Sequence, residues 1–128
     1  MDCLEYPLIR PMATADKGRG VIAVSDIAAG NVIEQSCTIE LGAADCEAVR
    51  VTLIEDYYFA HPVDDKCGLM VLGLASLCNH AETPNVDTSF IHDDKLGWIV
   101  LLTANQTIAA GTEITRRYAC PPWFQITA

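Results

Sequence analysis

Two short runs of β-branched and apolar residues mark the first recognisable pattern in this chain. They read Val-Ile-Ala-Val at 21–24 and Val-Ile-Glu-Gln at 32–35. β-Branched residues favour strands, and the segment between the runs ends in Gly30-Asn31, a pair typical of turns. The pattern therefore predicts a β-hairpin formed by these two strands.

A similar arrangement returns near the end of the chain. The apolar run 98–103 leads through a connector into a second strand-like run at 113–115. Both connectors contain the tetrapeptide Ile-Ala-Ala-Gly, at 27–30 and at 108–111. The glycine in each indicates a turn. We expect two similar strand–turn–strand segments, one at each end of the chain.

The middle of the chain gives a less regular pattern. Residues 45–58 place several apolar side chains loosely on one helical face and are closed by Pro62, which predicts a short helix or an irregular insert. Residues 68–75 are continuously apolar, so periodicity does not separate a buried strand from a buried helical turn, and either would be core. The apolar positions of the first segment are Ala48, Val51, Leu53 and Ile54.

Length and composition fit one globular domain covering residues 1–128. The chain has 128 residues, of which 51% are hydrophobic and 20% are charged. Many short strands separated by Gly and Pro, with little helix, predict a mainly β fold. The net charge of −9 argues against direct nucleic-acid binding and favours a basic partner. The alternative is that the acidic residues only keep the protein soluble.

The cysteines and the apolar runs limit the classes of site and of location. The six cysteines form no Cys-x-x-Cys pair and have no histidine at zinc-finger spacing, so we expect no metal site and mostly buried, reduced thiols. No apolar run approaches the roughly 20 residues of a membrane span, and the start of the chain lacks the features of a signal peptide. We expect a soluble intracellular protein, in the nucleus or the cytoplasm, without membrane contact.

Three motifs in a fixed order carry the chemistry. They are Gly-Arg-Gly at 18–20, Ser-Leu-Cys-Asn-His-Ala-Glu-Thr-Pro-Asn at 76–85 and Gly-Thr-Glu-Ile-Thr-Arg-Arg-Tyr at 111–118. Together, over about residues 18–123, they resemble the SET domain of protein lysine methyltransferases, in particular its minimal stand-alone viral forms. The resemblance implies a β-clip fold of short curled sheets with a C-terminal pseudoknot.

The resemblance also implies a binding site for S-adenosylmethionine. In the SET family the Gly-x-Gly turn and the Asn-His pair contact this methyl donor, which here assigns Gly18, Arg19, Gly20, Asn79 and His80. Judged from the residues alone, the glycines favour a tight turn into the following strand over a ligand loop, in which missing side chains would let the backbone approach a ligand closely. Two polar side chains after an apolar run equally suit satisfied core groups.

Aromatic residues complete the expected lysine channel. The resemblance makes Tyr118 the catalytic tyrosine, places Tyr57 of the Glu-Asp-Tyr-x-Phe segment at the active site, and assigns Trp123 to close over the cofactor. Tyr58 and Phe59 are further candidates for the channel wall, since aromatic faces accept a lysine stem and a methylammonium cation. The alternative for each is an ordinary core or surface aromatic.

The sequence departs from the family pattern at two places. Ala81 stands where the family has Ser, and Arg116 stands where an apolar or aromatic side chain lines the lysine site. Arg116 leaves three alternatives. Its side chain turns outward, the channel is unusual, or catalysis has been lost while the fold remains.

Three functions follow from these observations. The first is a protein lysine methyltransferase that uses S-adenosylmethionine on a lysine in a basic segment such as a histone tail, and a homodimer is compatible with so small a domain. The second is an inactive SET-like module that binds a peptide or partner. The third is a related β-clip binding domain of the SAF type, which gives no reason for Asn79, His80 and Tyr118 to occur in order.

Overall fold

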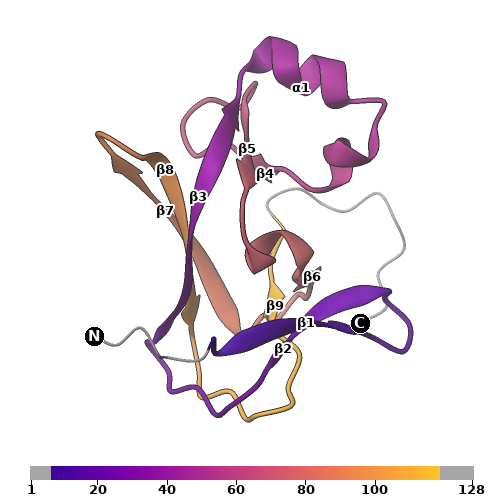
Figure 1. Ribbon diagram of the computed structural model, residues 1–128, viewed down its shortest axis with the longest axis vertical. Helices are drawn as coiled ribbons and strands as arrows, with labels where there is room; N and C mark the ends of the chain where they lie inside the picture. The colour runs from indigo at the N-terminus through magenta and orange to yellow at the C-terminus, as the bar shows by residue number, and fades with distance from the viewer. Residues whose placement is uncertain (1–6, 119–128) are drawn as a thin grey trace.

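The computed structural model describes residues 7–118, and every structural statement below concerns that part of the chain. It is mainly β, as predicted, and consists of short curled sheets with little helix (Figure 1). The elements are β1 (Ile9–Ala13), β2 (Arg19–Ala23), β3 (Val32–Leu41), α1 (Ala43–Val49), η1 (Leu53–Asp56), β4 (Phe59–Ala60), β5 (Gly68–Val71), η2 (Leu74–Leu77), β6 (Asn79–His80), β7 (Val86–Asp93), β8 (Gly97–Ala104) and β9 (Thr115–Arg116), where η denotes a 3-10 helix.

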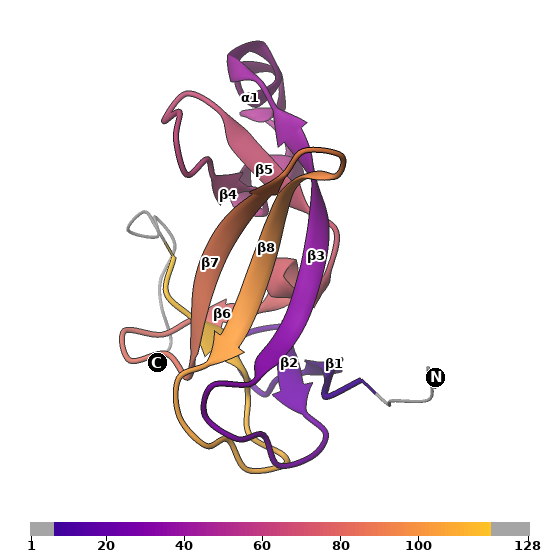
Figure 2. The same cartoon turned by 90° about the vertical axis from the view of Figure 1, so that its left-hand side faces the viewer.

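The largest sheet has the strand order β4-β5-β3-β8-β7, with all neighbours antiparallel. The long strand β3 connects its two halves, because Thr38 pairs with Val71 of β5 while Glu34 pairs with Leu102 of β8. Figure 2 shows β3, β8 and β7 side by side as one twisted layer, with α1 beyond one end and β1 and β2 beyond the other. Two smaller sheets contain β1 with β2 and β6 with β9.

The predicted hairpin between 21–24 and 32–35 is wrong. Strand β2 pairs antiparallel with β1, and β3 belongs to the larger sheet. The connector between β2 and β3 runs across the molecule instead of turning back, because Ile27 pairs with Ile108 of the second connector. Each isoleucine donates its N–H to the carbonyl of the other at 2.8 Å, and both side chains are buried. The two Ile-Ala-Ala-Gly segments are therefore partners.

The same exchange is repeated at the glycine end of each connector. Gly30 donates its N–H to the carbonyl of Ala104 at 2.8 Å, and Gly111 donates to the carbonyl of Ala23 at the same distance. Both glycines have positive φ, +90° and +88°, a region that favours glycine. The repeated tetrapeptide thus forms a local approximate two-fold arrangement, in which each half satisfies the backbone of the other.

The middle of the chain combines both predicted alternatives. Residues 68–75 form strand β5 and then enter the 3-10 helix η2, while the insert forms α1 and η1. Helix α1 begins where Asp45 accepts a hydrogen bond from the N–H of Gly42 at 2.9 Å. The expected apolar face of the insert does not pack on the core, since Val51 is 89% exposed and Leu53 78% exposed.

The core lies between the large sheet and the two connectors. Fully buried side chains come from β2, β5, β8 and the last connector, so distant segments contribute to one cluster. Of the four described cysteines only Cys78 is buried, which corrects the expectation of mostly buried thiols: Cys37 lies on an exposed position of β3. No helix in residues 7–118 is both long and apolar enough to cross a membrane. The largest fully buried side chains are Val21, Ile27, Leu69, Cys78, Val86, Val100, Leu102, Ile108 and Ile114.

Candidate functional site

Strand β6 brings the Asn-His pair beside the C-terminal motif. It pairs in parallel with β9, so that Asn79 lies opposite Thr115 and His80 opposite Arg116. Two strands of two residues each would be unstable alone, and the buried Asn85, which lies between β6 and β7 in the chain, holds the β9 segment in place. Asn85 donates its Nδ2–H to the carbonyl of Glu113 and accepts the N–H of Thr115 at its Oδ1, both at 2.9 Å.

Asn79 is part of a polar cluster with the Gly-Arg-Gly turn. Its Nδ2 donates to Glu113 Oε2 at 2.7 Å and to the carbonyl of Arg19 at 3.2 Å. Lys17 Nζ lies 3.6 Å from Glu113 Oε1. The carboxylate of Glu113 lies at the centre of this cluster. The glycine turn and the Asn-His strand are therefore joined directly.

The two glycines of the turn differ in function. Gly18 has φ +74° and open space where a Cβ would lie. At the buried Gly20 a Cβ would lie 2.7 Å from Glu113 Oε2 and 2.9 Å from Asn79 Nδ2, closer than real Cβ contacts. Gly20 thus gives room to the protein's own polar cluster, whereas the exposed backbone at Gly18 and Arg19 remains accessible to a ligand.

His80 and Tyr118 are held against each other. The buried His80 accepts the N–H of Tyr118 at Nδ1 (3.0 Å), and the two rings lie 5.0 Å apart. The Tyr118 hydroxyl donates to the carbonyl of Cys78 at 3.2 Å. Burial raises the pKa of Tyr118 above its ordinary value of 10.0, with nearby Arg116 opposing this effect, so the phenol is neutral at physiological pH. The predicted catalytic tyrosine is therefore fixed at both its backbone and its hydroxyl.

Arg116 does not turn outward. Its guanidinium lies over the ring of the buried Phe59 at 3.8 Å and over the ring of Tyr118 at 4.6 Å, measured to the ring centroids. Burial lowers the pKa of Arg116 below its ordinary value, with Tyr118 and Cys78 opposing the shift. The first of the three alternatives from the sequence is thus excluded, and the cation lies against two of the aromatic rings predicted to form the lysine channel.

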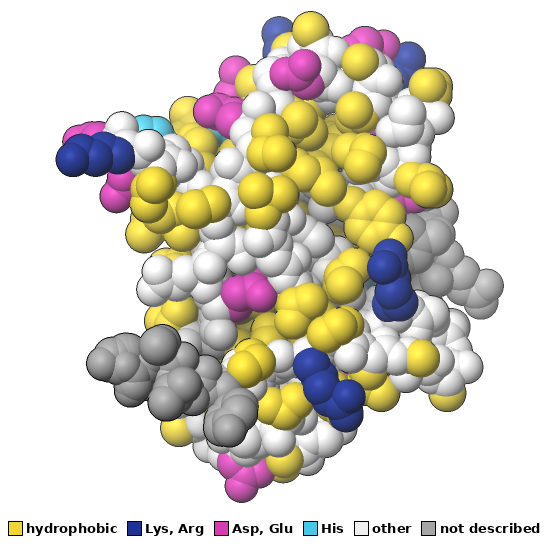
Figure 3. Space-filling view, in the orientation of Figure 1, with side chains coloured by type: hydrophobic (Ala, Val, Ile, Leu, Met, Phe, Trp, Pro, Cys, Tyr) yellow, Lys and Arg dark blue, Asp and Glu magenta, His cyan; other side chains and the backbone are white. Residues whose placement is uncertain are grey.

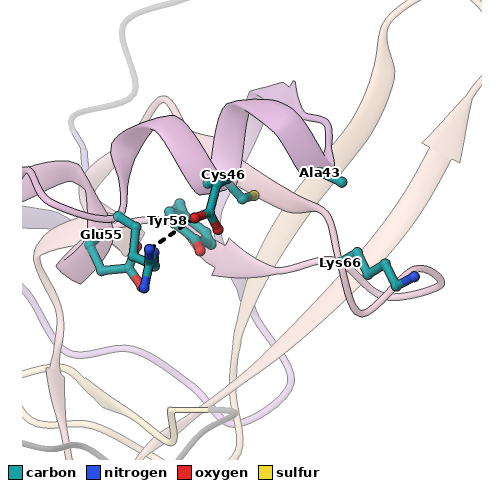
Figure 4. A pocket seen from close by; sticks show the side chains of 7 residues that line it. Ala43, Cys46, Glu55, Tyr58 and Lys66 are labelled. Atoms are coloured by element: carbon teal, nitrogen blue, oxygen red, sulfur yellow. Dashed lines mark hydrogen bonds and ion pairs between the residues drawn. The ribbon is translucent and has the colours of Figure 1, made fainter.

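The three consecutive aromatic residues point in different directions. Phe59 on β4 stacks on Arg116, and Tyr57 is close enough to Tyr118 to raise its pKa further. Tyr58 leaves this site: it packs against Gly68 and lines a separate cavity of about 350 Å³ beneath α1 (Figure 4). Tyr57 and Phe59, but not Tyr58, therefore lie at the predicted channel. The cavity is lined by Ala43, Cys46, Glu47, Arg50, Glu55, Tyr58 and Lys66.

Some contributors to the site escape sequence reasoning. Glu34 on β3 accepts the N–H groups of Leu74 and Ala75 at 2.9 Å each, and so fixes the start of η2, which leads into the Asn-His strand. No local motif marks this glutamate, because its partners lie far along the chain. Asn85 stands at the end of a sequence motif, but the motif alone did not predict its hydrogen bonds to Glu113 and Thr115. Trp123 lies outside the described residues, and residues 7–118 contain no group of three potential metal ligands.

The outer surface around α1, η1 and β5 is partly apolar. Figure 3 shows hydrophobic side chains gathered over the upper half of the face drawn in Figure 1, the part that contains α1, η1 and β5. The most exposed large apolar side chains there belong to the insert and to the loop before β5, namely Val51, Leu53 and Val63. The insert thus contributes surface more than core.

Comparison with known proteins agrees with this arrangement. A model of the SET domain matches residues 18–119, and the chain therefore belongs to the SET-domain family. Its fold is similar to those of solved SET-domain proteins. A search of curated proteins by sequence gives no match.

Three solved structures illustrate the likeness. A Plasmodium falciparum protein described as a histone methyltransferase is 22% identical with a TM-score of 0.72, over 88% of this chain and 98% of the other. The Neurospora SET domain protein DIM-5, a histone lysine methyltransferase, is 19% identical with a TM-score of 0.70, over 94% and 55%. Polycomb Repressive Complex 2 of Chaetomium thermophilum, bound to S-adenosylmethionine, is 18% identical with a TM-score of 0.71, over 88% and 15%. At these identities the comparison establishes the fold.

Proposed function

We propose that this chain is a protein lysine N-methyltransferase that uses S-adenosylmethionine and acts on a lysine in a basic protein segment, such as a histone tail. The observation that carries the proposal is the pairing of β6 with β9, which places Tyr118 against His80 and beside the Asn79 cluster. The net charge of −9 suits a basic substrate. The activities described for the Plasmodium and Neurospora proteins support the same class.

The chemistry of the residues near the glycine turn fits the proposed cofactor. Asn79 uses its Nδ2 for Glu113 and Arg19, and its Oδ1 has no partner among the described residues. This oxygen and the Glu113 carboxylate suit the ammonium group of an amino acid, and the open backbone at Gly18 permits close approach. S-Adenosylmethionine would supply an electrophilic methyl group on a positively charged sulfur. The residues we assign to it are Gly18, Arg19, Gly20, Asn79, His80 and, outside the described part, Trp123.

The aromatic residues would prepare the lysine. Tyr57, Phe59 and Tyr118 offer apolar faces to its aliphatic stem, and the Tyr118 hydroxyl, fixed at the Cys78 carbonyl, would orient the amine. Lysine must lose its proton before it acts as a nucleophile. Desolvation in the channel and the positive charge of Arg116 both disfavour the ammonium form and so lower the lysine pKa. No general base is then required in the channel.

The same Arg116 favours a second candidate function. A permanent cation between Phe59 and Tyr118 narrows the channel and repels a protonated lysine. A SET-like module that binds a protein segment without transferring a methyl group does not need a lysine in this channel, so the charge of Arg116 would not weaken its function. The two candidates differ in one measurable property, because only the enzyme needs the cofactor.

The test combines binding with transfer. Calorimetric titration of S-adenosylmethionine into the wild-type protein should show saturable binding, which Asn79→Ala should abolish. The matched control is Asn105→Ala, since Asn105 is an exposed asparagine whose side chain bonds Pro84 and Asp87 and not Glu113 or the glycine turn. Thermal melting of each variant separates lost binding from lost folding.

Radiolabelled methyl transfer to core histones then measures activity. Tyr118→Phe keeps the ring beside His80 and Arg116 but removes the hydroxyl, so label transfer should fall steeply while cofactor binding remains. Absence of cofactor binding in the folded wild-type protein would reject the methyltransferase and leave the binding module. Binding without transfer to any histone would keep the cofactor and direct the search to other basic proteins.

A further inference from the structure

Arg116 carries a largely buried positive charge without a counter-ion among the described residues. Its Nε is fully buried and has no hydrogen-bond partner there, and no ion pair of its guanidinium occurs within residues 7–118. A buried charge is ordinarily paired, because removal from water disfavours it. Stacking on Phe59 and Tyr118 covers the faces of the guanidinium, but hydrogen bonding occurs at its edge.

The neighbouring groups do not supply the missing anion. The carboxylate of Glu113 is engaged by Asn79 and Lys17, and that of Glu82 by Arg117 and His80.

The two ionisable groups beside Arg116 remain neutral as well. Burial raises the pKa of the Cys78 thiol to about 12, and it also raises that of the Tyr118 phenol. Within residues 7–118, therefore, no acidic group pairs with Arg116, and its guanidinium can accept an anion from a ligand.

We propose that the edge of Arg116 is a carboxylate-binding site within the aromatic channel. A guanidinium presents two parallel N–H groups that match the two oxygens of a carboxylate, and this planar fork is the usual arrangement of an Arg–carboxylate pair. The rings of Phe59 and Tyr118 hold the fork in one plane before the ligand arrives. Arg116 as a whole keeps part of its surface exposed, although its Nε is buried.

The source of the carboxylate is either a free small molecule or an acidic side chain in a bound segment. In the second case, which rests on the proposed function, the segment would place an Asp or Glu next to the lysine to be methylated. The acidic side chain would then neutralise Arg116 while the lysine stem occupies the remaining aromatic wall. The protein would then prefer substrate segments in which an acidic residue lies next to the lysine, in addition to the selection of lysine by the aromatic channel.

Nuclear magnetic resonance of the ¹⁵N-labelled full chain tests the site without any need for activity. The Arg116 Nε–H signal, assigned by its loss in Arg116→Met, is followed during addition of sodium acetate, with sodium chloride at equal ionic strength as the reference. We expect a saturable shift with acetate only. The control Arg117→Met removes an exposed arginine paired with Glu82 and should leave that shift unchanged. An Arg116 signal that responds equally to chloride and acetate would overturn the proposal.

A pair of peptides separates the two sources. Both contain one lysine, followed by Glu in one and by Gln in the other. Hydrogen bonds to charged groups predict roughly tenfold tighter binding of the Glu peptide to the wild-type protein, and no preference in Arg116→Met. An acetate response without peptide preference would assign the site to free carboxylates. Because neither measurement uses methyl transfer, an inactive protein that still binds acetate would refute the proposed function alone.

Discussion

Asn85 is the buried side chain that holds the segment of β9 in place. It is 6% exposed, and its amide satisfies the carbonyl of Glu113 and the N–H of Thr115 at 2.9 Å each. Asn85→Ala removes both bonds and leaves two backbone groups without partners. Each orphaned group costs about 1–3 kcal/mol, so the free energy of unfolding should fall by roughly 2–6 kcal/mol. That is a large part of the 5–15 kcal/mol of an ordinary domain.

Urea denaturation followed by circular dichroism measures this loss. The matched control Asn105→Ala removes an exposed asparagine with two bonds of 3.1 Å, and should change the free energy by less than about 1 kcal/mol. Hydrogen exchange should accelerate at the amide of Thr115 in the Asn85 variant. Equal losses in the two variants would refute the argument, because they would mean that water replaces both bonds of Asn85 without a penalty.

Three further predictions concern stability. Burial raises the pKa of Cys78 from 9.0 to about 12, so above pH 9 the folded state keeps a proton that the unfolded state releases. The free energy of unfolding should therefore fall by up to about 4 kcal/mol as pH rises from 9 towards 12. Urea titrations at successive pH values should show this decrease in the wild-type protein and a flatter curve in Cys78→Ala. Gly20→Ala forces a Cβ against Glu113 and Asn79, which predicts a loss of about 1–3 kcal/mol and a lower melting temperature, whereas an unchanged melting temperature would show that the cluster can shift. Glu34→Ala removes the acceptor of two N–H groups at the start of η2 and should cost about 2–4 kcal/mol in chemical denaturation, while Glu34→Gln, which keeps one acceptor oxygen, should lose less.

The family was readable in the sequence because it depends on short motifs. Gly18 to Gly20, the Asn79-His80 pair and Tyr118 each lie within a few residues of their own pattern. The assignment of these residues to cofactor and catalysis stays a prediction. The contacts of Glu113 with Lys17 and Asn79 appear only in the folded structure, because they join distant segments.

The failures have a common physical cause, which is pairing between distant segments. The run 21–24 has a clear strand pattern, but its partner is β1, where Pro11 interrupts any regular alternation. Turn residues near Gly30 therefore suggested a hairpin that does not form. The orientation of Arg116 depends on Phe59, which β4 brings in from the other half of the chain. Neither the pairing of β2 with β1 nor the contact of Arg116 with Phe59 can be predicted from the local periodicity of the sequence.

The exchange between the two Ile-Ala-Ala-Gly connectors has a consequence for the way the chain must fold during synthesis. The backbone groups of Ile27 and Gly30 find their partners only at Ile108 and Ala104, so the first connector stays unsatisfied until nearly the whole domain has left the ribosome. Contacts between such distant positions close late and slowly, because loop closure precedes any gain from them. A nascent chain truncated before Ile108 should therefore remain protease-sensitive along its entire N-terminal half, and the domain should become resistant in one step when the second connector emerges.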